Sequence, residues 1–418
     1  MVSLWCYLMG ASERDFRRVR RLVLPGGERF STVVDSCGAP AYYPTAFAIS
    51  RRSKGVSAET MAAQAADLVH IYLWAQRERI NLNERLEAGE YFGPAEVETL
   101  AEACGVGTSA LRKLTHRTVV DVRRGHTFTS EDTVTNQQKH RRLTTAMRYF
   151  EYVALMSEAR IPKKSHELPE RVTARRKMVD LISAYRPQLR SSRVRNAIKA
   201  ADLARVAAFV AAGSADEIWL DDAVAKRNWA IVTLLITCGL RQGEVRQLKP
   251  EDIDLSACQM RVERRHDDPD DERIYEPNAK TFDRIIPFSS ATAMLLEEYL
   301  LGPGSDAAEQ RGAPFLFLSH DNRTYGTPIS ARTVQRIVRN VGRHLSIEGL
   351  TPHHLRHAWV QGLANWAIET GINAEEFARF ANHLGGWSYI SKMATNYRAD
   401  HLTEEAYKAG VLIQEARS

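Results

Sequence analysis

The sequence predicts a mainly α-helical protein with a small antiparallel β-sheet in its second half. Several stretches carry apolar residues at helical spacing, and the clearest are residues 57–80, 94–106 and 137–159. Residues 259–265 and 272–289 instead alternate in the manner of strands, with a turn near a hairpin tip. Helices therefore dominate, and one small sheet is expected late in the chain.

Length and composition place the chain among soluble proteins of two or three domains. It has 418 residues, a formal charge of +6 and a pI near 9.0, which favours a polyanionic partner. Its 5 cysteines have no CxxC spacing, so we expect a reducing cytoplasm and neither a disulfide framework nor a zinc knuckle. The Arg cluster follows the apolar start, which is the wrong order for a signal peptide, and no apolar run reaches the roughly 18 residues of a membrane span.

Changes in composition suggest four segments in the order of the chain. Residues 1–55 contain Pro and Gly breaks and read as an irregular extension of unknown role; residues 56–162 form a helical domain that starts near Ser57. Residues 163–197 are strongly basic and read as a linker, and residues 198–418 form the second domain. Basic residues in these segments are candidate contacts to a DNA backbone, although a solvated face is the alternative: Arg112, Lys113, Arg123, Arg124, Lys163, Lys164, Arg193, Arg195, Arg332 and Arg336.

The second domain opens with helices at residues 200–212 and 228–240, and Gly239 ends the latter. Arg241 follows at once, with Glu244 three residues on and able to orient it. Arginine has a planar fork that grips two phosphate oxygens together. Lys280, on the predicted hairpin, can reach into a groove and donate a proton. The alternatives are an ordinary surface Arg–Glu pair and an exposed turn lysine.

An acidic run at residues 267–272 could hold a cation. Its spacing matches no calcium motif, so the sequence favours a solvated loop.

The segment TPHHLRH places three imidazoles and a guanidinium in the opening turns of a predicted helix. Thr351 suits the cap position and Pro352 the first helical position. His353 and Arg356 then share a face with the N–H groups of the helix start, which makes a natural cradle for a phosphate. The alternatives are a helix that begins with polar residues by chance, or a zinc site using His353 and His357.

Near the carboxyl end, Trp387 offers an indole donor and Tyr397 follows in a polar segment before a short final helix at residues 402–416. Taken in chain order, six of the candidate residues resemble the signature of the tyrosine recombinases, the phage integrase family: Arg241, Lys280, His353, Arg356, Trp387 and Tyr397. The segments GLRQGEVRQL, NAKTFDRIIPF, TPHHLRHAWV and HLGGWSYISKMATNY resemble the family in order and approximate spacing. Residues 57–159 resemble its helical core-binding domain more loosely, so the expected fold pairs that domain with a mixed α/β catalytic domain.

The resemblance implies that Tyr397 attacks a DNA phosphate, forms a 3′-phosphotyrosyl link and releases a 5′-hydroxyl, with no metal, ATP or other cofactor. Arg241 and Arg356 would bind the non-bridging oxygens. His353 would assist proton transfer or hydrogen-bond the phosphate, Lys280 would be the general acid, and Trp387 would fill the His-or-Trp position of the family. The implied partners are double-stranded DNA, further copies of the chain in a tetramer on two DNA sites, and accessory recombination proteins, in a bacterial, DNA-associated setting.

Several alternatives stay open at this point. His383 is the other candidate for the His-or-Trp position, because Gly385 and Gly386 stand where many relatives have a Gly-His pair. Tyr389 and Tyr407 compete with Tyr397 for the nucleophile. A type IB topoisomerase would use the same chemistry without strand exchange. A DNA-binding regulator without cleavage and a zinc hydrolase are the remaining function classes.

Overall fold

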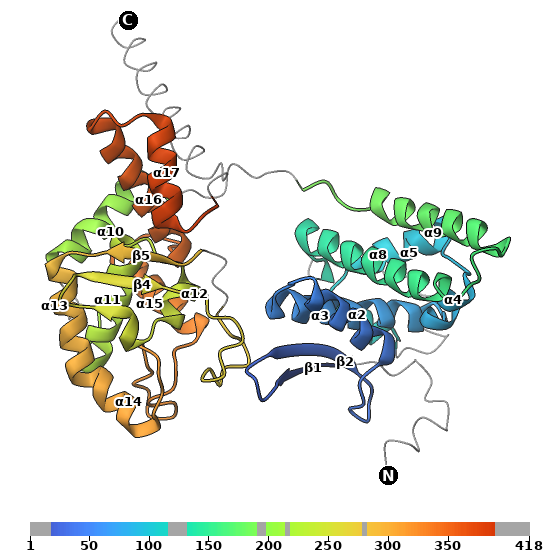
Figure 1. Ribbon diagram of the computed structural model, residues 1–418, viewed down its shortest axis with the longest axis horizontal. Helices are drawn as coiled ribbons and strands as arrows, with labels where there is room; N and C mark the ends of the chain where they lie inside the picture. The colour runs from blue at the N-terminus through green and yellow to red at the C-terminus, as the bar shows by residue number, and fades with distance from the viewer. Residues whose placement is uncertain (1–17, 116–131, 190–197, 214–217, 278–281, 389–418) are drawn as a thin grey trace, which may run out of the picture. The chain divides into compact units, whose positions relative to one another are not determined.

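The computed structural model describes residues 18–115, 132–189, 198–213, 218–277 and 282–388, and these fall into two compact units, residues 1–193 and 194–418 (Figure 1). Each unit is described by itself. The expected final helix at residues 402–416 lies outside the described residues. Within the described parts, no helix combines the length and the apolar character needed to cross a bilayer.

The described part of the first unit starts with a β-hairpin and a helix, so the expectation of an irregular extension at residues 1–55 is wrong for residues 18–53. Strand β1 (Arg18–Val23) pairs antiparallel with β2 (Arg29–Val34), and helix α2 (Tyr42–Ser53) follows. Val33 and Phe47 are buried and belong to the core of the unit. The apolar residues of this region lie among polar residues and Pro and Gly breaks, so the sequence showed no clear strand or helix pattern here.

The helices expected at residues 57–80, 94–106 and 137–159 are confirmed. Among the described residues of this unit, six helices follow α2: α3 (Ala58–Arg77), α4 (Leu82–Ala88), α5 (Pro94–Cys104), α6 (Thr108–Thr115), α8 (Asn136–Glu158) and α9 (Glu167–Ala184). Ser57 caps α3, because its hydroxyl accepts a hydrogen bond from the N–H of Thr60 at 3.4 Å. Trp74 of α3 and Tyr149 and Phe150 of α8 are fully buried, so these two long helices carry the core.

Helix α9 lies in the stretch expected to be a basic linker, and its contacts show that residues 167–184 belong to the folded unit. Met178 and Ile182, one helical turn apart, are buried in the core. Arg175 is also buried, and its Nε donates to Glu158 at 2.9 Å. The sequence did not indicate this helix clearly, because Met178 and Ile182 lie among many Arg and Lys residues.

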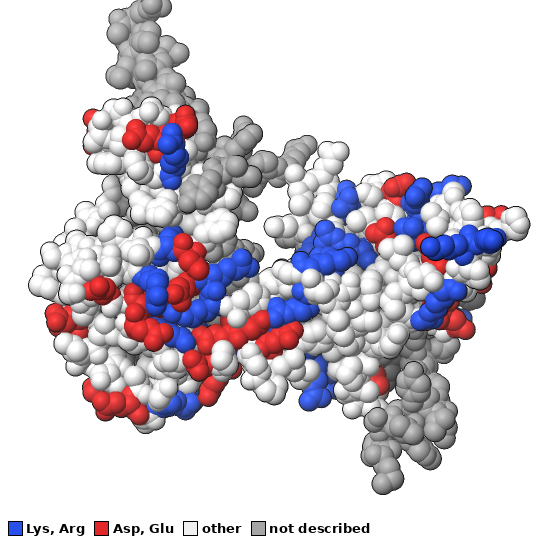
Figure 2. All heavy atoms as spheres, viewed as in Figure 1, with Lys and Arg blue, Asp and Glu red and all other residues white. Residues whose placement is uncertain are grey.

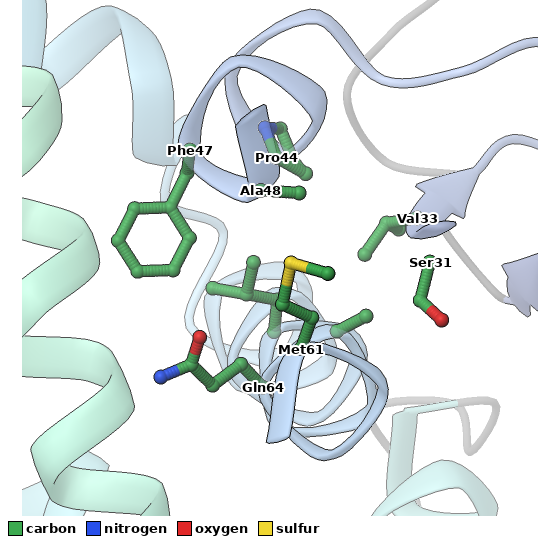
Figure 3. A pocket seen from close by; sticks show the side chains of 9 residues that line it. Ser31, Val33, Pro44, Phe47, Ala48, Met61 and Gln64 are labelled. Atoms are coloured by element: carbon green, nitrogen blue, oxygen red, sulfur yellow. The ribbon is translucent and has the colours of Figure 1, made fainter. Parts of the chain in front are cut away.

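One small cavity lies between β2, α2 and α3 (Figure 3). Its lining is mostly apolar, with Phe47 and Met61 among the contributing side chains, and Gln64 is the main polar residue. The Gln64 side-chain oxygen is buried and has no hydrogen-bond partner among the described residues. The space suits about one water molecule, so it is a packing feature and no substrate pocket.

The second unit contains a small antiparallel sheet surrounded by helices, as the sequence predicted (Figure 1). The sheet has strand order β3-β4-β5, formed by β3 (Ile253–Asp254), β4 (Gln259–Val262) and β5 (Arg284–Pro287). Met260 and Ile286 face each other across β4 and β5 and are buried. The strand that was expected within residues 272–289 is shorter in the structure: β5 covers only Arg284–Pro287, and residues 272–277 form a loop.

In the described parts of the second unit, the helical elements are α10 (Ala200–Ala212), α11 (Asp222–Thr237), α12 (Gln242–Gln247), a 3₁₀ turn (Pro250–Asp252), α13 (Ser290–Tyr299), a π-helical turn (Leu300–Gly304), α14 (Ser305–Arg311), α15 (Ala331–His344), α16 (Pro352–Glu369) and α17 (Ala374–Gly385). Helix α11 is buried on all sides from Arg227 to Ile236, and Ile231, Leu234 and Leu235 are fully buried. It packs against α12, α13, α15 and α16, so it fixes the helices that carry the polar residues of interest.

Candidate active site

Polar side chains meet in the second unit where α12 and α16 begin, where α17 ends and where β5 starts. A buried carboxylate, Glu244 of α12, lies at their centre with its side chain 0% exposed. Its oxygens accept hydrogen bonds from the backbone N–H of Arg241 at 2.9 Å and from the guanidinium of Arg284 at 3.1 and 2.9 Å. Arg241 and Arg356 also place side-chain nitrogens near it, at 3.4 and 4.0 Å. We call Arg241, Glu244, Arg284 and Arg356 the arginine–glutamate group.

The last turn of α17 supplies backbone acceptors to the same arginines. The carbonyl of Gly385 accepts from Arg241 at 3.2 Å and from Arg356 at 2.6 Å, and the carbonyl of Leu384 accepts from Arg284 at 2.7 Å. Carbonyl groups at a helix C-terminus carry partial negative charge, so they attract guanidinium groups. The arginines therefore converge on one helix end.

Two glycines make this helix end possible. Gly386 ends α17 in the left-handed conformation, with φ 63°, which favours glycine. At Gly385 the position of a Cβ would lie 2.8 Å from the ring of Trp387. The pair Gly385-Gly386 thus lets the indole of Trp387 fold back over the helix end.

Arg356 is the most enclosed of the expected site residues, with its side chain 4% exposed. Its guanidinium donates to the carbonyl of Gly239 and lies 4.9 Å from the ring centroid of Trp387. Gly239 has φ 62°, and a Cβ there would lie 2.2 Å from the ring of Trp359. The glycine that ends α11 is therefore required by both its backbone conformation and its aromatic neighbour.

The histidines at the start of α16 have distinct contacts. His354 contributes to the helix cap, because its Nδ1 accepts from the N–H of Thr351 at 3.2 Å and lies 3.0 Å from the Thr351 hydroxyl. Burial lowers the pKa of His354. His354 therefore has a structural role at the start of α16. His353, on the exposed side, has its Nε2 2.8 Å from Nε2 of His357.

The structure thus brings together Arg241 and Arg356, with Trp387 against Arg356. His353 stands three residues before Arg356 on the same helix. His383, the other candidate for the His-or-Trp position, is exposed, whereas Trp387 is partly buried. Lys280 and Tyr397 lie outside the described residues, as do Tyr389 and Tyr407. Arg284 was not singled out by the sequence analysis; its strand alternation gave no sign of a partner in α12.

The structure describes six of the ten residues that were expected to contact DNA. All six are exposed side chains: Arg112, Lys113, Lys163, Lys164, Arg332 and Arg336. The other four, Arg123, Arg124, Arg193 and Arg195, lie outside the described residues. In the space-filling view, Lys and Arg side chains gather on the visible face of the first unit, whereas both signs mix on the second (Figure 2).

The acidic run at residues 267–272 is only partly a solvated loop. Lys249 lies 3.3 Å from Asp268 and 3.1 Å from Asp270, and Arg273 pairs with Asp271 at 2.7 Å. Asp268 and Asp271 are buried, so these carboxylates hold the loop against the unit through ion pairs. Arg273 directly follows the run, whereas Lys249 lies well before it in the sequence, so the acidic residues alone did not indicate these ion pairs.

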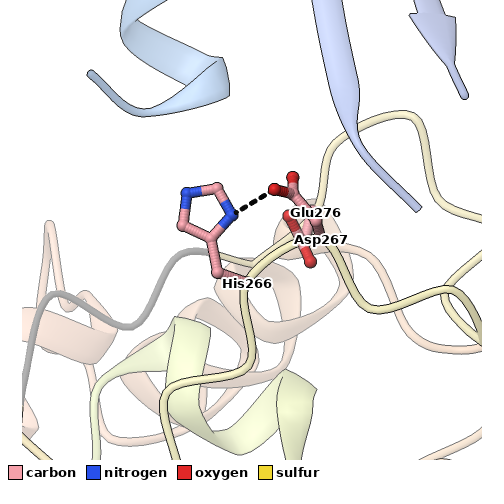
Figure 4. A group of neighbouring side chains, drawn as sticks. All are labelled: His266, Asp267 and Glu276. Atoms are coloured by element: carbon pink, nitrogen blue, oxygen red, sulfur yellow. Dashed lines mark ion pairs between the residues drawn. The ribbon is translucent and has the colours of Figure 1, made fainter. Parts of the chain in front are cut away.

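A side-chain group beside this run has donors of the kind that metals accept. His266, Asp267 and Glu276 place one potential ligand atom each within 4.8 Å of one another (Figure 4). Contacts within the protein already engage them, because His266 Nδ1 lies 3.1 Å from Asp267, and Glu276 accepts from the N–H of Asp268 at 2.9 Å. These contacts account for the arrangement without an ion.

Comparison with known proteins assigns the class of the second unit. Residues 212–404 match the phage integrase family. The chain is 29% identical over 188 residues to tyrosine recombinase XerA of Pyrococcus furiosus, covering 44% of this chain and 56% of that protein. It is 30% identical over 168 residues to tyrosine recombinase XerC of Vibrio campbellii, covering 40% and 46%. The second unit is therefore similar to the tyrosine recombinases of the phage integrase family.

The matched region spans about half the length of these curated relatives. Two solved structures are also similar. The XerA recombinase crystal structure has 18% identity and a TM-score of 0.35, with 88% of this chain and 98% of that chain covered. The Tn1549 transposon integrase in complex with transposon right end DNA has 16% identity and a TM-score of 0.40, with 86% and 98% covered.

Proposed function

We propose that this protein is a site-specific DNA recombinase or integrase that cuts and rejoins duplex DNA through a 3′-phosphotyrosyl intermediate. The observation that carries the proposal is the meeting of Arg241 and Arg356, far apart in sequence, at one carbonyl oxygen of Gly385. The arginine–glutamate group has three guanidiniums and one carboxylate, which leaves an excess of positive charge. Such an excess stabilises a phosphodiester, and more so the extra charge of its transition state.

In the proposed reaction, the hydroxyl oxygen of Tyr397 forms a bond to phosphorus while the bond from phosphorus to the 5′-oxygen breaks. Lys280 gives a proton to that leaving oxygen, and the tyrosine proton passes to a base near the site. Arg241 and Arg356 bind the non-bridging oxygens, and His353 donates a hydrogen bond to one of them. The covalent link keeps the phosphodiester energy, so attack by a 5′-hydroxyl reseals the strand without ATP or metal.

Trp387 has a defined place in this proposal. Its ring lies 4.9 Å from the guanidinium carbon of Arg356 and packs over Gly385. It thereby limits the positions open to Arg356, and we assign it the His-or-Trp position in preference to His383. A tetramer on two DNA sites, with accessory proteins as further partners, would carry out the strand exchange that distinguishes recombination from topoisomerase activity.

The test uses nicked duplexes from the genomic neighbourhood of the protein, designed so that cleavage traps the covalent adduct. The wild-type chain should become linked to the 3′ end of the cut strand, and Tyr397→Phe should bind the same duplex without forming the adduct. Tyr389→Phe and Tyr407→Phe serve as matched controls. An adduct that persists in Tyr397→Phe would move the nucleophile to another residue, and relaxation of supercoiled DNA without strand exchange would favour the topoisomerase alternative.

A further inference from the structure

The first two turns of α16 carry a histidine pair whose second member has no part in the proposed reaction. His353 and His357 are four residues apart, so they face the same side of the helix. Their Nε2 atoms lie 2.8 Å apart, and their rings meet edge to face, with centroids 4.2 Å apart and an interplanar angle of 82°. His354 points elsewhere, since it caps the helix through Thr351. The contact is therefore specific to this pair.

A hydrogen bond between two imidazole nitrogens couples their protonation. A neutral imidazole has one N–H donor and one acceptor nitrogen, and a protonated one has two donors. Two protonated rings could not share this bond, because both Nε2 atoms would be donors. When both rings are neutral, one Nε2 carries hydrogen and the other does not, so the tautomer of one ring fixes that of its partner.

We propose that His357 is a positioning residue that fixes the ring orientation and tautomer of His353. The Nε2–H of His357 donates to Nε2 of His353, which places the His353 hydrogen on Nδ1. His353 can then donate from Nδ1 to a phosphate oxygen at the helix start, where the first N–H groups also favour an anion. This inference rests on the proposed function, because it assigns a partner to the histidine of that site.

The first test is a double-mutant cycle that measures the single-turnover rate of adduct formation on a nicked duplex. His357→Ala should slow the reaction roughly tenfold or more, since losing the group that sets a catalytic tautomer is costly. His353→Ala should slow it further. The double variant should be no slower than His353→Ala alone, because His357 acts through His353. Gln361→Ala, one turn further along the same stripe, is the matched control and should match the wild type.

A conservative variant separates positioning from mere support of the fold. The amide N–H of His357→Gln can still donate to His353, so this variant should recover part of the rate that His357→Ala loses. Duplex affinity, measured by fluorescence anisotropy, should be equal in all variants. Equal rates for His357→Ala and the wild type, or additive losses in the double variant, would overturn the inference.

A second measurement does not depend on activity. In ¹⁵N-histidine spectra of the full chain, the His353 signals, identified by their loss in His353→Ala, should show a protonated Nδ1 and an unprotonated Nε2. His357→Ala should mix the two tautomers. An unchanged His353 pattern would reject the inference even if the wild type forms an adduct. A wild type without adduct but with this coupling would instead reject the proposed function alone.

Discussion

Both units bury an arginine against carboxylates, but with opposite balances of charge. In the first unit, Arg175 lies between two carboxylates, Glu158 at 2.9 Å and Glu151 at 3.2 Å. In the arginine–glutamate group of the second unit, one carboxylate serves three guanidiniums. The first arrangement fastens α9 to α8. Among the described residues, the second arrangement has more guanidiniums than carboxylates and therefore favours an anion. This balance of charge, and not burial itself, separates a structural contact from a candidate site.

The largest expected effect comes from removing a guanidinium from the second arrangement. Arg356→Ala and Arg241→Ala should each slow adduct formation by about 10²–10³-fold, or about 2.7–4 kcal/mol, because each removes charge stabilisation of the transition state. Single-turnover assays measure this. Arg379→Ala is the control, since its pair with Glu375 is exposed and should contribute little. If Arg379→Ala slowed adduct formation as much as Arg356→Ala, the proposed difference between site arginines and arginines in ordinary ion pairs would be wrong.

The next effect concerns the carboxylate. Glu244→Ala leaves the buried guanidinium of Arg284 without its ion pair, so we expect a loss of about 3–5 kcal/mol in the free energy of unfolding. Chemical denaturation of the full chain measures this loss in the transition of the second unit. Glu244→Gln retains hydrogen-bonding atoms and should lose less. If both variants unfold like the wild type, the carboxylate does not hold the group together.

In the first unit, Arg175→Ala should lower the free energy of unfolding by about 2–3 kcal/mol. This loss is smaller than that expected for breaking a fully buried ion pair, because Glu151 is partly exposed. The substitution should leave the rate of adduct formation on a bound duplex unchanged, because the charge of Arg175 is already balanced by two carboxylates. A rate loss comparable to that of Arg241→Ala would show that the first unit takes part in the chemistry.

The smallest effect is a pH dependence that both units share. Burial, and secondarily the charge of Arg142, lowers the pKa of His70 to about 3, and burial lowers that of His320 in the second unit to about 4. Below about pH 6.5 these two histidines become protonated in the unfolded chain but stay neutral in the folded one. The free energy of unfolding should therefore fall as the pH drops toward the folded-state pKa values, by at most about 1.4 kcal/mol per pH unit for each histidine. Calorimetry between pH 7 and 5 measures this, and His70→Gln should flatten the slope for the first unit.

Strong local patterns made much of the fold predictable. Helices α3, α5 and α8 follow their apolar periodicity, and Ser57 caps where expected. Arg241 and Glu244 were paired correctly because they lie three residues apart. Arg284 was missed because its contact with Glu244 joins residues 40 positions apart. Hairpin β1-β2 and helix α9 were missed because their few apolar residues lie among Pro, Gly or basic ones.

The oxygen that Arg241 and Arg356 share belongs to the backbone of Gly385. A point substitution changes side chains and leaves peptide carbonyls in place, so this junction is resistant to ordinary mutation as long as the chain continues to turn at Gly386. Its most direct probe is therefore chemical: an ester in place of the amide between these two glycines would weaken the acceptor while every side chain stayed native.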